Sequence, residues 1–343
     1  MKKITLLLLF MATMVWFPIN GHASDIPFSV RTILPENQLN KKVTYFDLLL
    51  SENQEQEIQL ELTNSSDAEQ KVKVEPNNAT TNSNGVIEYK KVDKKKDSSM
   101  KYGLTDIISP AQEILLAPHE VKKISFKLKM PNEKMNGVIL GGFYVSKLTT
   151  DSASEKKDEG VQLKNEFSYV VGVQVRQNEN LVKPNLKLNN VKAGLKNYRT
   201  SILANLQNDQ PTILKNLKVD VSIYKQGASE VLYSQKSEEM SVAPNSNFDY
   251  PIDLKNAEII PGQYVLKGTA SSGEQTWNLE KEFVIDNKVA KESNKEAVEL
   301  VDAKPDYQTL LLIIVVANVV IIGILIYFLV IRKSKAKKTK LNY

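Results

Sequence analysis

The sequence has 343 residues, no cysteine and only two histidines, so disulfide frameworks, Cys–His catalytic pairs and His-rich zinc sites are excluded. Its formal net charge is +5, but eight of the 45 Lys and Arg residues lie in the first 23 or last 12 residues. The region between them has 37 basic residues against 40 acidic ones, a net charge of about −3. That balance argues against a nucleic-acid-binding surface, which requires a clustered basic face.

The N-terminus has the pattern of a secretory signal peptide. Lys2 and Lys3 precede the apolar run Ile4–Phe17, and the small-residue site Gly21-His22-Ala23 follows. We therefore predict a signal peptide over residues 1–23, which is removed after Ala23. An exported chain without cysteine must be stabilised by its apolar core alone, which favours the surface of a Gram-positive bacterium over an animal secretory pathway.

The region after the signal peptide alternates apolar and polar residues with a period of two, which predicts β-strands with one buried face. Such strands are expected at residues 58–62, 72–74, 124–130, 167–175, 186–188, 202–206, 217–223, 248–254, 264–266 and 277–285. Short strands separated by turn signals predict an all-β ectodomain of two Ig-like antiparallel β-sandwich domains. The domains are expected at 26–150 and 160–287, with Trp277 and Tyr264 in the second core.

The segment Val138–Val145 differs because it is nearly all apolar and therefore expected to be buried on both faces. Gly141-Gly142 at its centre predicts a bulge or a close approach of another group to the backbone. A polar linker or loop, 149–160, follows it. The next strand, 167–176, could begin the second domain or complete the first sandwich, and the sequence leaves both possibilities open.

A short internal repeat supports two related sandwiches. Leu62-Thr63-Asn64 with a following strand at 72–74 matches Leu206-Gln207-Asn208 with a strand at 219–221. Later, Leu116-Ala117-Pro118 matches Val242-Ala243-Pro244, and each precedes another strand. The order of strand, Asn-led turn, strand and Ala-Pro turn is the same in both halves.

The C-terminal part reads as a stalk and a membrane anchor. Residues 288–309 are charged and predict a stalk, and Leu310–Ile331 is a run of 22 residues without a charge. As a helix this run would be about 33 Å long, enough to cross a hydrocarbon core. The basic tail, 332–343, is then cytoplasmic by the positive-inside rule, which predicts a single-pass type I protein in the cell membrane with its ectodomain in the cell wall.

Three groups of residues form an ordered set of motifs behind the signal peptide. They are Phe28-Ser29-Val30 with Pro35-Glu36-Asn37-Gln38 and Tyr45-Phe46-Asp47-Leu48; Ala79 to Gly85 with Ile87 and Tyr89; and Met130-Pro131 with Gly137 and Ile139-Leu140-Gly141-Gly142. Taken together, the chain resembles the WxL-interacting proteins of Gram-positive bacteria. The resemblance implies an N-terminal peptidoglycan-binding domain, a C-terminal host-binding domain and WxL-domain surface proteins as partners. One departure is Ser51-Glu52-Asn53, where the family often has a Pro-Gly turn.

Recognition of peptidoglycan would require amides, which both donate and accept hydrogen bonds, and aromatic faces that pack on sugar rings. The candidate ligand-binding residues are Asn37, Gln38, Tyr45, Asn82, Asn84 and Tyr89. The alternative for the asparagines is structural, because Asn84-Gly85 is a hairpin-turn signal and the others can cap turns. The basic run from Lys90 to Lys96 could contact anionic wall polymers, but a solvated hairpin flank accounts for it as well.

No Gly-rich phosphate loop, G-x-S-x-G elbow or metal-ligand cluster occurs in the sequence, so we expect neither an enzyme, a catalytic residue, a metal nor a cofactor. The predicted function is that of a non-enzymatic cell-surface adaptor or adhesin component. Its first domain would bind peptidoglycan, and its second would bind WxL-type surface proteins or host extracellular matrix proteins. The alternative is a chaperone-like assembly factor for surface proteins.

Overall fold

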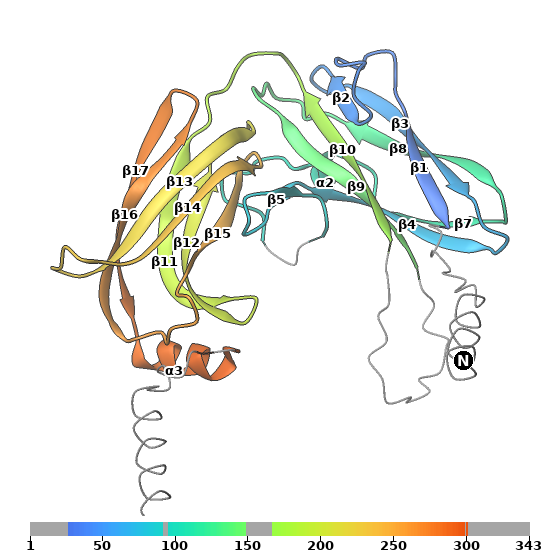
Figure 1. The fold of residues 1–343 in the computed structure, drawn as a ribbon. Helices are drawn as coiled ribbons and strands as arrows, with labels where there is room; N and C mark the ends of the chain where they lie inside the picture. The colour runs from blue at the N-terminus through green and yellow to red at the C-terminus, as the bar shows by residue number, and fades with distance from the viewer. Residues whose placement is uncertain (1–26, 92–94, 149–166, 299, 301–343) are drawn as a thin grey trace, which may run out of the picture. The chain divides into compact units, whose positions relative to one another are not determined.

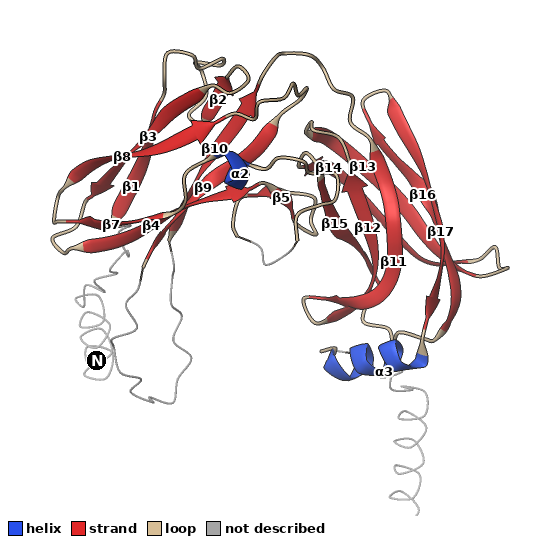
Figure 2. Cartoon of the chain, turned by 180° about the vertical axis from the view of Figure 1, so that it is seen from behind, coloured by secondary structure: helices blue, strands red, loops and turns tan. Residues whose placement is uncertain are grey.

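The computed structural model describes residues 27–91, 95–148, 167–298 and 300. Strands dominate this part of the chain, which confirms the predicted all-β ectodomain (Figure 2). The predicted signal peptide, membrane-spanning run and basic tail lie outside the described residues. Among the residues that the structure describes, no helix has the length and apolar character needed to cross a membrane.

The elements follow one another along the chain as Figure 1 labels them. The strands are β1 Phe28–Ile33, β2 Phe46–Leu49, β3 Glu55–Asn64, β4 Gln70–Asn78, β5 Thr80–Thr81, β6 Ile87–Glu88, β7 Gln112–Leu116, β8 Val121–Lys129, β9 Ile139–Lys147, β10 Ser168–Arg176, β11 Leu186–Lys196, β12 Arg199–Asn208, β13 Leu214–Lys225, β14 Val231–Val242, β15 Ser246–Asp253, β16 Gly262–Ser272 and β17 Gln275–Ile285. The helices are α2 Leu104–Ile107 and α3 Asn287–Glu296.

The described chain forms two compact units. The first contains the chain up to Lys187 together with Leu206–Leu217 and Glu239–Phe248. The second contains Leu188–Asn205, Lys218–Glu238 and the chain from Asp249 onwards. A boundary between the units therefore falls within each of the strands β11 to β15, although the strands themselves are continuous.

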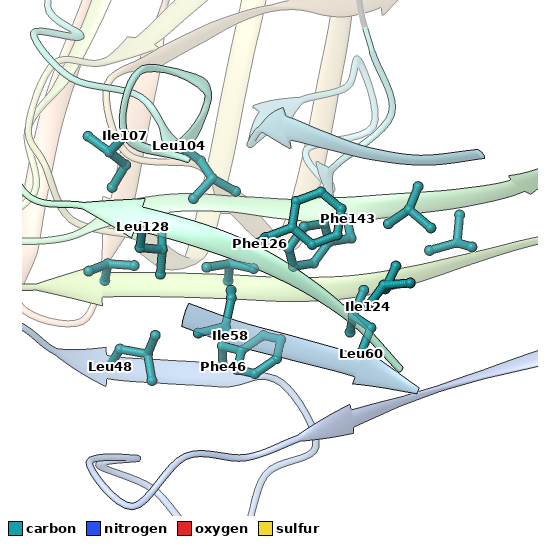
Figure 3. Packing of buried hydrophobic residues seen from close by; sticks show 14 of the residues in the cluster. Phe46, Leu48, Ile58, Leu60, Leu104, Ile107, Ile124, Phe126, Leu128 and Phe143 are labelled. Carbon is teal, nitrogen blue, oxygen red and sulfur yellow. The ribbon is translucent and has the colours of Figure 1, made fainter. Parts of the chain in front are cut away.

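The first unit is built on a sandwich of a three-stranded sheet, β1-β3-β8, and a five-stranded sheet, β2-β10-β9-β4-β7. In strands such as β3 and β8 apolar residues alternate with polar ones, and the two inner faces form one core, shown in Figure 3. Phe126 of the first sheet packs against Phe143 of the second, with ring centroids 4.6 Å apart. As predicted from its apolar run, β9 buries five consecutive residues, Ile139–Phe143.

Strand β10 belongs to the sheet of the first sandwich, since it pairs along its length with β9 and at its end with β2. The pairing with β2 is parallel, whereas we expected antiparallel sheets throughout. Parallel neighbours require a long connection, and 118 residues separate the end of β2 from the start of β10. Asp47 of β2 is buried and accepts a hydrogen bond from the Arg176 guanidinium at 2.5 Å.

The later strands form a three-stranded sheet, β11-β12-β15, and a four-stranded sheet, β14-β13-β16-β17. Alternate residues are buried, such as Val219, Val221 and Ile223 in β13, which is the pattern of a sandwich. Tyr264 lies in the core as predicted, while Trp277 is only half-buried.

Helix α3 occupies the first part of the segment predicted to be a stalk. Ala290 is its buried residue, and the Asn294 side chain donates to the Ile259 carbonyl and accepts from the Ile259 amide. The sequence shows no apolar stripe here because one small residue and one amide side chain, rather than a row of large apolar residues, attach the helix.

Candidate functional site

A groove of about 600 Å³ lies on the first unit, beside the N-terminal half of β10. Three tyrosines line it: Tyr45 from the loop before β2, Tyr89 from the segment after β6, and Tyr169 from β10. Val30 and Thr32 of edge strand β1 form another wall. The groove therefore combines aromatic and aliphatic surface with hydroxyl groups, and it gathers residues from six separate parts of the sequence, which include Leu140 of β9 and Ile213 before β13.

Two glycines opposite each other allow the tyrosines to lie on the sheet. Gly142 of β9 pairs directly with Gly172 of β10. A Cβ atom at Gly142 would lie 2.9 Å from a ring carbon of Tyr89, and one at Gly172 would lie 3.5 Å from Cβ of Tyr45. The close approach predicted for Gly142 is thus confirmed, and the approaching group is the Tyr89 ring.

The structure places Tyr45 and Tyr89, two of the predicted binding residues, in the same groove. Tyr45 keeps 39% of its surface exposed. Burial raises the pKa of the Tyr89 hydroxyl, and the neighbouring Tyr45 raises this pKa further. The Tyr89 hydroxyl therefore stays protonated over the physiological range and can both donate and accept hydrogen bonds.

Gln38, also a predicted binding residue, is buried and holds the loop that carries Tyr45. Its Nε2 donates to the Tyr45 carbonyl at 2.8 Å, and its Oε1 accepts from the Asp47 amide at 3.0 Å. The buried side chain replaces two backbone partners that this irregular loop lacks. In this arrangement Gln38 positions Tyr45, and its amide is already committed to the backbone.

None of the three asparagines is among the residues that line the groove. Asn37 exchanges two side-chain hydrogen bonds with Gln56, at 2.8 and 2.9 Å. Asn82 accepts from the amides of Asn84 and Val86 and so shapes the turn between β5 and β6. Asn84 is exposed at that turn, next to Gly85 with its positive φ. These contacts match the turn-forming alternative, and a role in ligand binding stays a prediction for all three.

Tyr169 and Gly172 are residues of the groove that sequence reasoning missed. Tyr169 looked like an ordinary alternating strand residue, and its ring does pack edge-to-face on Phe28 with centroids 5.4 Å apart. The signal that could have found them is the glycine in the middle of a β-branched strand, which marks a close approach just as Gly142 does.

The lining is poor in charge, which limits the chemistry that this groove can perform. Arg31 is its charged residue, and its guanidinium is paired with Glu61 at 2.7 Å. Among the described residues, no group of three or more His, Asp or Glu side chains is placed to hold a metal ion. Flat aromatic faces with hydroxyl groups at their edges suit an uncharged ring that carries its own hydroxyl or amide groups.

Comparison with solved structures finds matches of low similarity. They include the class 5 fimbriae chaperone CfaA (15% identity, TM-score 0.28, covering 74% of this chain and 99% of that one) and the E. coli chaperone DraB (13%, 0.26, 75% and 98%). The YadV chaperone is another (9%, 0.27, 76% and 100%). At TM-scores this low the similarities carry no conclusion. A comparison with curated proteins found no match.

Comparison with protein families is decisive. Residues 28–147 match the peptidoglycan binding domain of the WxL Interacting Protein, and residues 158–295 match its host binding domain. The second match starts before β10, although β10 completes the sheet of the first sandwich. Together the two matches cover most of the sequence, in the order that the family resemblance implied. The chain belongs to the WxL-interacting protein family.

Proposed function

We propose that the protein is a non-enzymatic cell-surface adaptor that binds peptidoglycan through its first domain. Its second domain binds WxL-type surface proteins or host extracellular matrix proteins, and the run Leu310–Ile331 anchors it in the membrane. A cell-surface binding role follows from the two matched domains. The particular ligands, the anchoring and the binding residues are the proposed part.

The observation that supports a site for peptidoglycan is the groove lined by Tyr45, Tyr89 and Tyr169. Amino sugars present C–H faces that pack on aromatic rings, and their hydroxyl and N-acetyl groups bond to hydroxyl edges. Half of the lining residues come from the segment matched by the peptidoglycan binding domain, and most of the others, including Tyr169 and Gly172, come from β10. We therefore infer that the functional first domain extends to Arg176, the end of β10.

The test is co-sedimentation with insoluble peptidoglycan, with and without its teichoic acids. The protein should comprise residues 24–300, because a fragment that ends at 150 lacks β10 and one wall of the groove. Retention on stripped wall is expected. In Tyr45→Ala we expect about tenfold weaker binding, equivalent to ~1.4 kcal/mol. The exposed Tyr198 of the second unit provides the control, since Tyr198→Ala should bind as wild type.

The outcomes separate the components of the proposal. Retention only on wall that carries teichoic acid would assign binding to anionic polymers and remove the groove from the proposal. Binding that Tyr45→Ala leaves unchanged would place the peptidoglycan site elsewhere in the domain. Release of soluble muropeptides during prolonged incubation would contradict a non-enzymatic role.

A further inference from the structure

Exposed apolar side chains gather around α3, at one end of the second unit. Tyr198 is 69% exposed, Ile260 is 62% exposed and Val298 is 50% exposed. The Val298 amide donates to the Tyr198 carbonyl at 2.9 Å, and Asn294 of α3 holds the backbone of Ile259, next to Ile260. We call these three residues the basal patch. Grouped exposed apolar residues of this kind mark an interaction surface.

The backbone at Tyr198 is an unusual place for an aromatic residue. Asn197 and Tyr198 form the two-residue connection between β11 and β12, with φ values of 51° and 61°. Two-residue turns with both φ values positive favour Asn followed by Gly, because a bulky side chain is strained in this conformation. The fold therefore tolerates strain to hold an exposed tyrosine at the tip of this turn.

The course of the chain indicates what lies near the basal patch. Nine residues, 301–309, connect the end of the described chain to the apolar run Leu310–Ile331. Fully extended, they would span about 30 Å, so a membrane-inserted run would keep the α3 end of this unit close to the lipid surface. The opposite end, at the β16–β17 turn, is ten residue steps away along the hairpin, or roughly 33 Å.

We propose that the basal patch rests on the lipid surface, with Tyr198, Ile260 and Val298 inserted at headgroup level. This inference rests on the membrane anchoring proposed above. Tyrosine suits that position because its ring is apolar and its hydroxyl is wet. The contact fixes the end of the second domain that faces the membrane, so that the β16–β17 turn is presented outwards.

The charges around the patch predict little selectivity for lipid charge. Lys288, Lys291 and Lys295 share one face of α3 by their spacing, and Glu292 lies 4.0 Å from Lys288. Glu296 is a second anion of α3, and the adjoining turns and strand ends add the cations Lys196, Arg199 and Lys255 and the anions Asp253, Glu258 and Asp286. Cations and anions nearly balance, so apolar contact rather than electrostatic attraction governs the association.

The absence of cysteine allows a direct test with the full chain reconstituted in lipid nanodiscs. Ile260→Cys, labelled with an environment-sensitive fluorophore, should lose most of its emission when the bilayer carries headgroup nitroxide lipids. Glu274→Cys, labelled at the β16–β17 turn, is the matched control and should keep its emission. Similar quenching is expected in zwitterionic and anionic bilayers. If the two labels respond alike, the proposal is wrong.

A second variant separates lipid contact from folding. Tyr198→Gly relieves the backbone strain, so thermal stability should stay the same or rise while quenching at position 260 falls. Asn197→Gly changes the same turn without removing an apolar group and should leave quenching unchanged. Unchanged quenching in Tyr198→Gly would overturn the proposed insertion of this residue. Failure of the chain to co-elute with nanodiscs would instead contradict the anchoring itself.

Discussion

The two sandwiches share one structural device and differ in another. In the first, the buried Asn64 side chain donates to the carbonyls of Ala68, Leu116 and Ala117. In the second, the buried Asn208 donates to the carbonyls of Thr212 and Ala243. The Asn-led turn is therefore joined to the Ala-Pro turn in both, which gives the short sequence repeat a physical basis.

The difference lies at the edge of the five-stranded sheet. There β2 joins β10 in parallel, with buried Asp47 bonded to Gln174 and Arg176, and the tyrosine groove lies beside this pairing. The repeated asparagines therefore stabilise the scaffold of both sandwiches, whereas the candidate site depends on the β2–β10 edge, which only the first sandwich has. Four predictions test this division, from the largest expected effect to the smallest.

The ion pair that distinguishes the first sandwich should have the largest effect. Arg176→Met leaves the buried Asp47 carboxylate without its cation, and we expect unfolding free energy to fall by about 3–5 kcal/mol. The exposed Glu55–Lys129 pair is the control, and Lys129→Met should have little effect because solvent screens this pair. Urea denaturation followed by circular dichroism measures both. Equal losses would show that burial does not distinguish the two pairs.

The shared asparagines should have the next largest effects. Asn64→Ala removes its hydrogen bonds to three carbonyls, and we expect a loss of about 3 kcal/mol, against roughly 2 kcal/mol for Asn208→Ala, which removes its bonds to two carbonyls. Urea denaturation followed by circular dichroism measures both variants, and the fluorescence of Trp277, the only tryptophan after the predicted signal peptide, reports unfolding of the second sandwich. Exposed Asn84→Ala is the control with almost no expected change. A larger loss at Asn208 would contradict this counting of hydrogen bonds.

The paired glycines should respond unequally to the same added methyl group. Gly142→Ala brings Cβ to 2.9 Å from both the Tyr89 ring and the Val171 carbonyl oxygen, so we expect a loss of about 1–3 kcal/mol. Gly172→Ala makes an ordinary contact at 3.5 Å and should be nearly neutral. Thermal unfolding of the two variants gives the comparison. Similar stability of both would show that the Tyr89 ring moves aside easily.

The smallest effect concerns alkaline pH. The pKa of Tyr89 is raised in the folded protein, mainly by burial, so the folded state keeps this proton to a higher pH than the unfolded chain does. The contribution of protonated Tyr89 to the free energy of unfolding is complete below the unfolded pKa of about 10 and is lost as pH rises through the folded pKa. The free energy of unfolding of Tyr89→Phe should therefore fall less than that of wild type between about pH 9 and 11. Urea titrations at each pH give the free energy of unfolding. If this free energy falls with pH equally in the two proteins, the prediction is wrong.

Much of the strand content was predictable because apolar alternation is a local signal. The strands that carry Leu60, Val74 and Phe126 follow that pattern, and the core contains these residues. Helix α3 was not predictable in the same way, because its attachment depends on Ala290 and on the Asn294 side chain bonding a distant turn. Tyr45 and Tyr89 could be predicted as binding candidates because aromatic faces pack on sugar rings. The structural alternative for the asparagines could be predicted because asparagine favours turns.

The sequence by itself determined the all-β class, the repeated asparagine turns and the family, because alternation, turn residues and ordered motifs are read along the chain. Only the tertiary structure decided that Tyr45, Tyr89 and Tyr169 meet, that β10 completes the first sandwich, and that Gln38 is buried under the Tyr45 loop. The physical reason is distance along the chain. The bond between Gln174 and Asp47 joins residues 127 positions apart, and no local pattern specifies such a pairing.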